Sequence, residues 1–350
     1  MEKQNRQIGR TQTLIDTQAL VIGAGPVGLY QAFQLGLLGF DCQVIDVLPQ
    51  IGGQCVELYP DKPIYDIPGM SRCTGRQLIE QLQKQLKPFE VPFHLRQQVA
   101  ALAPSPQGGY LVHTDQGQAF QAQGVFIAAG VGAFVPRSWA LEGLSDLEGV
   151  FHANDPQTSP KPKPHVLVAG GDASVMPVLR EWLTRPHASL TLVHRREKLD
   201  LPDGDQIWLD AMIHGRQIRF VVGQPVSCQS EQGRVHIIEL APPEGEPMAL
   251  PCDVLVQCLG LSPKLGPIAQ WGLDMAKRQV KVNTQDYGTS LPGVYAVGDV
   301  NHYPGKRKLI ACGFHEATLA AYGFAERQQG GPVTLEYTTA SARLHARLKV

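Results

Sequence analysis

The chain has 350 residues, of which 43% are hydrophobic, and 31 Lys plus Arg balance 32 Asp plus Glu. This length suits two domains of roughly 150 residues each, and the near-zero net charge gives no support for a nucleic-acid or membrane-surface partner. The polar start MEKQNRQIGR lacks the apolar core of a signal peptide, and no later stretch approaches the ~20 apolar residues of a membrane helix. We therefore expect a cytoplasmic protein that binds neither nucleic acid nor membrane.

The cysteines of the chain argue against a metal site. Seven are present, and no two of them form a C-x-x-C pair. Zinc sites and dithiol redox centres both need closely paired cysteines, so we expect buried free thiols and no metal. The seven are Cys42, Cys55, Cys73, Cys228, Cys252, Cys258 and Cys312.

A βαβ unit with a glycine-rich turn is predicted near the start of the chain. Residues 18–22 predict a short buried strand, a helix follows to about residue 38, and residues 41–46 predict the next strand. The turn between the first strand and the helix lies in VIGAGPVG, residues 21–28. Such a unit holds a pyrophosphate on backbone N–H groups at the helix N-terminus.

The next elements extend this sheet. A helix is predicted over residues 76–86, whose apolar residues fall on one face. Residues 93–102 and 110–114, joined by a turn, indicate an antiparallel appendage to a parallel sheet. Residues 124–129 predict another apolar strand, after which the chain leaves the first domain.

The second half of the chain repeats the first arrangement. Prolines recur at every second position in SPKPKPH, residues 159–165, so this segment cannot be helical and is predicted to be a linker. Beyond it, residues 165–169, a glycine turn, a helix to about residue 182 and residues 190–194 again give strand, turn, helix and strand. We interpret this as a duplicated fold.

The final elements return to the first domain. Residues 254–260 predict a buried strand of the second domain. GVYAVGD, residues 293–299, predicts an apolar strand with an acid at its end, and a helix over about residues 313–327 follows. The first domain is therefore predicted to be split, with the second inserted into it.

The first glycine turn is predicted to bind FAD. Gly23, Gly25 and Gly28 satisfy G-x-G-x-x-G between a strand and a helix, and Pro26 lies at the start of that helix. Asp46 ends the following strand, where an acid accepts a hydrogen bond from a ribose hydroxyl. The alternative is a glycine-rich turn without a ligand.

The second glycine turn is predicted to bind NADPH. Its glycine positions read Ala169, Gly171 and Ser174, and we expect the Ala169 methyl to crowd a pyrophosphate. The strand after it ends in HRR, and two arginines there suit a 2′-phosphate through planar multi-donor contacts. The alternative is an exposed basic turn. The predicted NADPH set is Gly170, Gly171, Asp172, Ala173, Ser174, His194, Arg195 and Arg196.

The whole chain resembles the two-dinucleotide-domain flavoproteins, and among them the thioredoxin-reductase-like ferredoxin–NADP reductases of bacteria. The resemblance implies an enzyme that transfers electrons between NADPH and a one-electron carrier, ferredoxin or flavodoxin, through FAD. The segments that carry it are VIGAGPVG, GGQCVELYPDKPIYDIPG (52–69), AAGVGAFVPR (128–137), LVHRRE (192–197) and VYAVGDVNHYPGKRKLIACGFHEA (294–317).

Two related branches are disfavoured by their cysteines. Thioredoxin reductases carry a C-x-x-C before the second glycine turn, where this chain has VFHANDPQTSP. In the glutathione-reductase branch, Cys55 would match the first redox cysteine, but Pro60 occupies the position of the second. We expect Cys55 to be a packed thiol near the cofactor, with a lone redox cysteine as the alternative.

The resemblance also implies FAD contacts outside the first turn. Asp46 and Gln54 would hold the ribose and pyrophosphate region, and Tyr59 would lie flat on one flavin face. Val99 would meet the adenine through its backbone. Because orientation and electrostatics suffice for electron transfer through a flavin, we expect no catalytic acid or base.

Later segments complete the implied cofactor site. Phe134 belongs to a stretch that lines the cofactor, and Asp299 would bond the ribityl chain. In the C-terminal extension, Tyr337 would cover the other flavin face and Thr338 would approach the reactive flavin nitrogen, with Thr339 as an alternative. The tail would cover either its own flavin or that of a partner in a homodimer.

These assignments define domains, partners and competing functions. The predicted α/β fold has two Rossmann-like three-layer domains, with FAD bound by residues 1–135 and 285–350 and NADPH by the inserted residues 136–284. Alternatives are an NADPH oxidase or quinone reductase, and a non-catalytic FAD/NADPH redox sensor. Electron carriers of this kind are acidic, so a basic docking surface is expected. Its candidates are Lys306, Arg307, Lys308, Arg343, Arg347 and Lys349.

Overall fold

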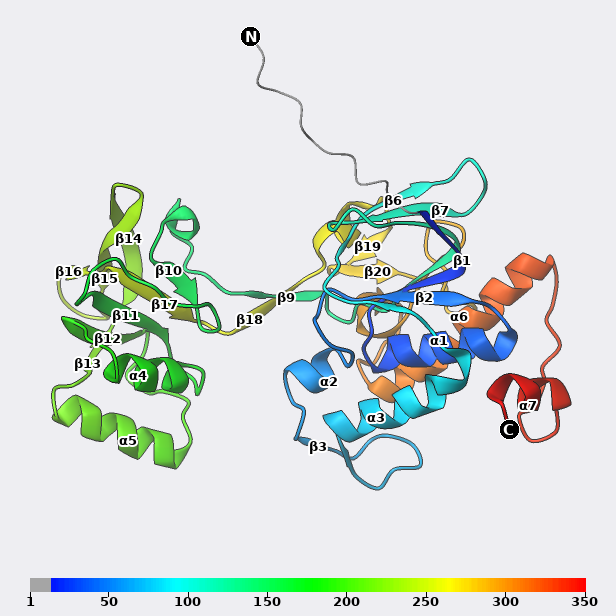
Figure 1. Cartoon of the computed structure of the whole chain (residues 1–350), viewed down its shortest axis with the longest axis horizontal. Coiled ribbons are helices and arrows are strands. Elements are labelled where there is room, and N and C mark those ends of the chain that lie inside the picture. Colours follow the sequence, from blue (N-terminus) through cyan, green and yellow to red (C-terminus); the bar gives the residue numbers. More distant parts are fainter. Residues whose placement is uncertain (1–13) are drawn as a thin grey trace, which may run out of the picture. The chain divides into compact units, whose positions relative to one another are not determined.

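The computed structural model describes residues 14–350 and divides the chain into two compact units (Figure 1). Unit 1 contains the chain up to Ala133 together with Pro263–Val350, and unit 2 is Phe134–Ser262. The chain crosses between the units in β9 (Ala133–Pro136) and β18 (Leu261–Lys264), which pair with each other. The predicted insertion of one domain into the other is therefore confirmed.

The end of the inserted unit differs from the predicted one. Unit 2 ends at Ser262, whereas the sequence suggested residue 284. The intervening segment belongs to unit 1 because Ile268, Leu273 and Val280 are buried in the same hydrophobic cluster as the strands of the unit 1 sheet. The first crossing lies within two residues of the predicted one, whereas the second, in β18, has no linker-like composition that would mark it in the sequence.

A seven-stranded sheet forms the middle of unit 1. Its strands are β1 (Leu14–Ile22), β2 (Cys42–Ile45), β5 (Phe93–His94), β6 (Val99–Pro104), β7 (Tyr110–Thr114), β8 (Ala119–Ile127) and β21 (Val294–Ala296). Their order is β5-β2-β1-β8-β7-β6, and β21 also pairs with β8. The β6–β7 and β7–β8 pairs are antiparallel and the others are parallel, which confirms the predicted antiparallel appendage.

Helices cover one face of this sheet, and a 3-10 helix with two short strands covers the other. The helices of unit 1 are α1 (Pro26–Leu38), α2 (Gln54–Glu57), α3 (Gly75–Leu86), α6 (Ile310–Gln329) and α7 (Ala342–Leu348). The short elements are β3 (Pro63–Ile64), β4 (Cys73–Thr74), β19 (Met275–Ala276), β20 (Gln279–Lys281), β22 (Asn301–His302) and the 3-10 helices η1 (Lys87–Phe89), η3 (Gly266–Gln270) and η4 (Gly298–Val300). Helices α1, α3 and α6 share one core cluster with β3, β4 and η1, whereas η3, β19 and β20 pack into a second on the other face. Unit 1 thus has three layers.

Sequence signals explain where two of these helices begin and end. Helix α3 starts with a capping box, in which the Thr74 hydroxyl accepts from the Gln77 N–H and the Gln77 side chain accepts from the Thr74 N–H. Helix α1 ends at Gly39, whose φ of 85° is readily adopted by glycine.

Unit 2 is built around a five-stranded parallel sheet with the order β10-β17-β11-β12-β13. These strands are, respectively, Val150–His152, Val254–Cys258, His165–Gly170, Ser189–His194 and Arg219–Val222. On one face lie α4 (Val175–Leu183) and α5 (Asp203–His214), and on the other an antiparallel sheet of β14 (Gln224–Glu231), β15 (Arg234–Ala241) and β16 (Met248–Pro251), with η2 (Leu144–Asp146). The predicted three layers and second βαβ unit are confirmed.

From residue 14 onward, the structure contains neither a membrane-spanning helix nor a metal-binding cluster. No helix there is long and apolar enough to cross a membrane. No group of three or more His, Cys, Asp and Glu side chains there could hold a metal ion.

Candidate dinucleotide-binding sites

The first glycine turn joins β1 to α1 at the carboxyl end of the unit 1 sheet. A Cβ on Gly28 would lie 1.8 Å from the Gly23 oxygen, so only glycine lets the helix approach the strand this closely. A Cβ on Gly25, by contrast, would meet nothing closer than the Gly53 Cα at 3.9 Å. The space beside Gly25 is what the close approach of a pyrophosphate requires.

The N-terminus of α1 is prepared for an anion. Gly25 is its N-cap, Pro26 follows at the first helical position, and no side chain caps the helix. The first turn of α1 also contains no acidic residue. The N–H groups of this turn, with the positive end of the helix dipole, are therefore available to a phosphate.

Asp46 lies at this turn, as predicted. Its Oδ2 accepts a hydrogen bond from the Ala24 N–H at 2.6 Å, and its Oδ1 accepts one from the Leu48 N–H at 2.8 Å. Burial raises the pKa of Asp46, and the bonds from backbone N–H groups oppose that rise. Each carboxylate oxygen keeps a further lone pair, which fits a ribose hydroxyl.

Three other predicted FAD residues surround the same end of unit 1. A Cβ on Gly130 would lie 3.0 Å from Gln54 Nε2, so the Gln54 amide lies against the chain that leaves β8. The Tyr59 hydroxyl accepts a hydrogen bond from Cys55 Sγ at 3.7 Å, which gives Cys55 a packing partner. Val99 is buried at the start of β6, where its backbone pairs with that of Thr114.

Asp299 lies in η4, which a buried carboxylate holds in place. Glu316 of α6 is completely buried. Its carboxylate accepts four hydrogen bonds, from Gly298 N (2.7 Å), Asn301 Nδ2 (2.8 Å), Tyr303 OH (2.9 Å) and Lys306 Nζ (2.5 Å). Lys306 Nζ also donates to the Gly298 carbonyl at 2.8 Å, so the ion pair binds both the N–H and the carbonyl of Gly298 in η4. We call this arrangement of Glu316 and Lys306 the Glu316 clamp.

The Asp299 carboxylate itself accepts no hydrogen bond from any described residue. Burial raises its pKa, while the charges of Lys306 and Lys308 lower it. A rigidly held, half-buried acceptor without a protein donor fits a hydroxyl of a ribityl chain. Together with the open anion site at Gly25 and the remaining lone pairs of Asp46, this acceptor fits the needs of FAD.

The predicted basic docking surface is much smaller than the sequence suggested. The prediction of Lys306 as a docking residue is wrong, because its side chain is buried against Glu316. Three tail residues are also engaged within the chain: Arg343 pairs with Glu336, Arg347 donates to the Leu37 oxygen (2.5 Å) and Lys349 pairs with Glu90 (2.6 Å). Of the six candidates, Arg307 and Lys308 remain exposed without an ion pair in the described residues.

The predicted flavin-covering residues lie in a C-terminal tail, residues 330–350, that forms several hydrogen bonds within itself. The Tyr337 carbonyl accepts from the N–H groups of Ala340 and Ser341, and His345 Nε2 contacts the Thr338 carbonyl at 2.6 Å. Tyr337 is 66% exposed, and Thr338 and Thr339 are exposed as well.

The tail docks at the end of α1 that is remote from the glycine turn. Arg347 of α7 lies over Gly39, where a Cβ would be 2.2 Å from Arg347 Nη2, and it donates to the Leu37 carbonyl. Phe134, also predicted to line the cofactor, lies in β9, and its side chain is outside the described part of the structure.

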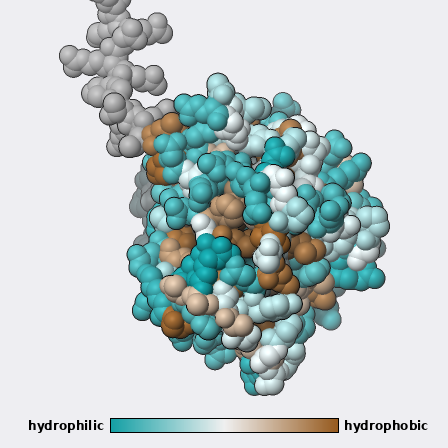
Figure 2. Space-filling model, turned by 90° about the vertical axis from the view of Figure 1, so that its right-hand side faces the viewer, coloured by the Kyte–Doolittle hydropathy of each residue, from teal (hydrophilic) through white to brown (hydrophobic). Residues whose placement is uncertain are grey.

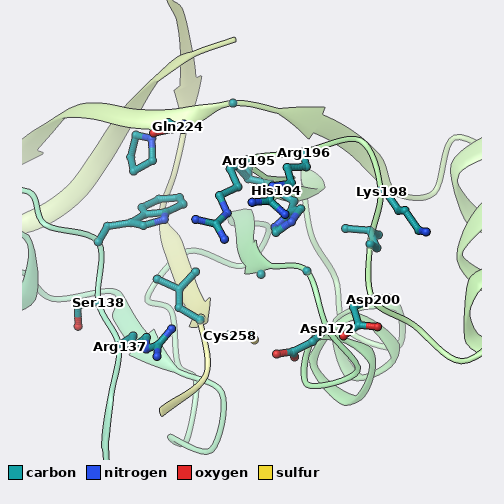
Figure 3. A pocket seen from close by; sticks show the side chains of 18 residues that line it. Arg137, Ser138, Asp172, His194, Arg195, Arg196, Lys198, Asp200, Gln224 and Cys258 are labelled. Atoms are coloured by element: carbon teal, nitrogen blue, oxygen red, sulfur yellow. The ribbon is translucent and has the colours of Figure 1, made fainter. Parts of the chain in front are cut away.

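The second glycine turn opens into a pocket of about 780 Å³ within unit 2 (Figure 3). Six predicted NADPH residues line it, namely Gly170, Gly171, Asp172, His194, Arg195 and Arg196. Ala173 and Ser174 follow at the start of α4 and do not line the pocket. The expected crowding by Ala169 is not found, because this residue is fully buried in the core cluster beneath the sheet.

His194 and Asp172 set the electrostatics of the turn. A Cβ on Gly171 would lie 2.3 Å from His194 Cε1, so the imidazole lies across the glycine. Burial, followed by the charges of Arg195 and Arg196, lowers the pKa of His194. The imidazole is therefore neutral near pH 7, and the arginines supply the positive charge of this strand end.

The pocket contains residues that sequence analysis missed. They are Arg137, Ser138, Trp139, Val193, Lys198, Leu199, Asp200, Gly223, Gln224, Pro225, Cys258 and Leu259. Most of these residues lie at or just after the carboxyl ends of β9, β12, β13 and β17. Their position at strand ends was the sequence signal that could have identified them.

Comparisons with known proteins agree with this architecture. A family model described as pyridine nucleotide-disulphide oxidoreductase matches residues 58–298. A ferredoxin–NADP reductase from Paracidovorax citrulli (strain AAC00-1) is 49% identical over 349 residues, covering 96% of this chain and 97% of the relative. The solved bacillithiol disulfide reductase from Staphylococcus aureus has a TM-score of 0.59 at 15% identity, covering 90% of this chain and 100% of that one. A thioredoxin reductase from Gloeobacter violaceus has a TM-score of 0.54 at 18% identity, covering 92% and 98%.

The solved neighbours show a two-domain Rossmann-like fold, as predicted, and the family model and the curated relative show that the chain is an oxidoreductase. The chain belongs to the pyridine nucleotide-disulphide oxidoreductase family. This confirms the family resemblance drawn from the sequence motifs.

Proposed function

We propose that this protein is an FAD-dependent reductase that transfers electrons between NADPH and a one-electron carrier protein, ferredoxin or flavodoxin. The observation that carries the proposal is the opposite chemistry at the two turns, with Asp46 at the first and Arg195 and Arg196 at the second. The sequence has no C-x-x-C pair, so it offers no internal dithiol to take the electrons. The name of the Paracidovorax relative supports the same class of carrier.

The residues of unit 1 would hold FAD in three places. The space at Gly25 and the N-terminus of α1 would receive the pyrophosphate, Asp46 the ribose, and Asp299 the ribityl chain. When bound, FAD supplies the conversion between two-electron and one-electron chemistry. The chain contributes position and electrostatics, and the Glu316 clamp fixes the backbone that carries Asp299.

We further propose that the protein acts as a homodimer in which the tail covers the flavin of the partner. The 13 residues of α1 span about 20 Å, and α7 is anchored at the end away from the glycine turn. Figure 2 looks onto the side where α6 and α7 lie in Figure 1, and hydrophobic residues gather in the middle of that face. Leu335 and Tyr337 are exposed hydrophobic residues of this C-terminal segment, which supports an interface.

A cytoplasmic location is part of the proposal. All seven cysteines are free, and Cys42, Cys55, Cys73, Cys252 and Cys258 are buried. Free, unpaired thiols are the norm for a protein kept in a reducing compartment.

Anaerobic mixing of the purified holoprotein with NADPH tests the proposed function. We expect the flavin absorbance to fall rapidly, and subsequent addition of oxidised ferredoxin or flavodoxin to restore it. Faster recovery with quinones or air than with any carrier protein would favour the oxidase or quinone reductase, and a flavin that stays oxidised would favour the sensor. A protein that purifies colourless and cannot be reconstituted with FAD would refute the proposal.

The nucleotide preference has its own test. Removing the guanidinium groups of Arg195 and Arg196 should weaken NADPH binding by about tenfold or more, because charge-assisted hydrogen bonds to a phosphate contribute about 1.5–3 kcal/mol. NADH, which lacks the 2′-phosphate, should be affected far less. Equal losses for both nucleotides in a binding titration would contradict the assignment.

A further inference from the structure

Arg137 is a cation of the unit 2 pocket to which the preceding assignments give no role. Figure 3 shows Arg195 and Arg196 beside His194 on one side of the pocket, whereas Arg137 lies beside Cys258 on another side. Among the described residues, no ion-pair or hydrogen-bond partner of the Arg137 guanidinium is present. Its donors are therefore available to a ligand.

The sheet order places the glycine turn between these two groups of arginines. Strand β11, which ends in the turn, lies between β12 and β17. Arg195 and Arg196 follow β12. The Arg137 N–H donates to the Gly260 carbonyl (3.0 Å) just beyond β17, and the Trp139 N–H donates to Gln257 Oε1 (2.7 Å) within β17. If the 2′-phosphate lies at the β12 side, the nicotinamide half of the nucleotide extends toward Arg137.

The second turn is electrostatically unlike the first. Asp172 Oδ1 accepts hydrogen bonds from the Ser174 N–H at 2.9 Å and the Ser174 hydroxyl at 2.5 Å. A carboxylate therefore already occupies donors at the start of α4, where a pyrophosphate would otherwise bind. The corresponding first turn of α1 has no acid and no side-chain cap. A pyrophosphate beside Asp172 needs an additional positive charge.

We propose that Arg137 binds the pyrophosphate of the pyridine nucleotide on its nicotinamide side and offsets the charge of Asp172. Phosphate recognition is then divided: Arg195 and Arg196 select the 2′-phosphate, and Arg137 binds the group that NADP⁺ and NAD⁺ share. The planar guanidinium suits two phosphate oxygens at once. This inference rests on the proposed function, because it takes the ligand of the pocket to be a pyridine dinucleotide.

Titration calorimetry of the holoprotein with three ligands tests the division. The ligands are NADP⁺, NAD⁺ and 2′,5′-ADP, which lacks the nicotinamide-side phosphate. Arg137→Gln should weaken NADP⁺ and NAD⁺ equally, by about tenfold or more, and leave 2′,5′-ADP within about twofold of the wild type. Arg195→Gln should show the other pattern, with losses for NADP⁺ and 2′,5′-ADP. Arg219→Gln removes the same charge from an exposed position outside the pocket and should change none of the three.

A second variant separates a charge effect from a folding defect. Adding Asp172→Asn to Arg137→Gln should recover part of the lost NADP⁺ affinity, because the carboxylate no longer repels the pyrophosphate. Unchanged NADP⁺ affinity in Arg137→Gln, an equal loss for 2′,5′-ADP, or no recovery in the double variant would overturn the inference. Each of these results would leave the proposed function standing if the wild type still binds NADP⁺ and its flavin is reduced by NADPH, whereas failure of the wild type would refute both.

Discussion

Replacing Lys306 with methionine should destabilise unit 1 strongly. The Lys306 side chain is 6% exposed and that of Glu316 is 0% exposed. Methionine fills a similar volume but leaves the Glu316 carboxylate buried without its counter-charge, although Gly298, Asn301 and Tyr303 would still donate to it. The dominant loss is therefore electrostatic.

The size of the effect follows from the burial of the pair. Removing one partner of a buried ion pair costs about 3–5 kcal/mol. In a unit of this size each 1 kcal/mol lowers the midpoint of thermal unfolding by roughly 2–4 °C, so the expected decrease is roughly 6–20 °C. Adding Glu316→Gln should reverse part of it, since the double variant no longer buries a lone charge.

Thermal unfolding followed by circular dichroism, together with flavin release, measures this prediction. Lys308→Met is the matched control, because Lys308 lies two residues away, is exposed, and should change stability by no more than about 0.5 kcal/mol. If the Lys306 and Lys308 variants unfold at the same temperature, the buried pair does not stabilise η4 and the argument fails. Early flavin release only in the Lys306 variant would tie the pair to the position of Asp299.

Three further predictions address the two nucleotide sites and the carrier. Gly25→Ala should fold normally yet retain little flavin, because the added methyl has space in the protein but lies where the pyrophosphate approaches. Gly28→Ala should also lower thermal stability, because its Cβ would lie 1.8 Å from the Gly23 oxygen. Normal flavin content in Gly25→Ala would contradict this prediction. His194 has a lowered pKa, which a bound 2′-phosphate would raise, so NADP⁺ affinity should gain a contribution as the pH falls from neutrality toward the lowered pKa of the free imidazole. Identical pH profiles of NADP⁺ affinity for the wild type and for His194→Gln would exclude that contribution. Neutralising Arg307 and Lys308 should raise the apparent KM for ferredoxin roughly two- to tenfold at low salt and little at high salt, and a KM that stays constant at low salt would remove this patch as a docking site.

The parts of the fold that depend on local backbone requirements could be predicted from the sequence. A G-x-G-x-x-G turn needs glycine because the helix approaches the strand too closely for a side chain, and Gly28 shows this directly. Gly39 likewise marks the end of α1. The acid and the arginines at the strand ends follow from the same βαβ geometry, so Asp46 and Arg195 were accessible too.

Properties set by tertiary contacts were not accessible in the same way. The run KRK at residues 306–308 is typical of an exposed loop, and nothing local shows that Lys306 is paired with Glu316 inside the protein. Arg137 reaches the pocket because β9 crosses into unit 2 immediately before it, a position that only the folded crossing defines. Ala169 was expected to face the ligand, but its strand orientation buries it beneath the sheet.

The paired crossing strands β9 and β18 bring the two ends of residues 134–262 together. A short turn joining residues 133 and 263 would thus restore an unbroken chain through unit 1. An inserted domain of this kind can be gained, lost or exchanged in a single genetic event without changing the connections of the surrounding fold. The residues that line the pocket of unit 2 can therefore evolve independently of unit 1.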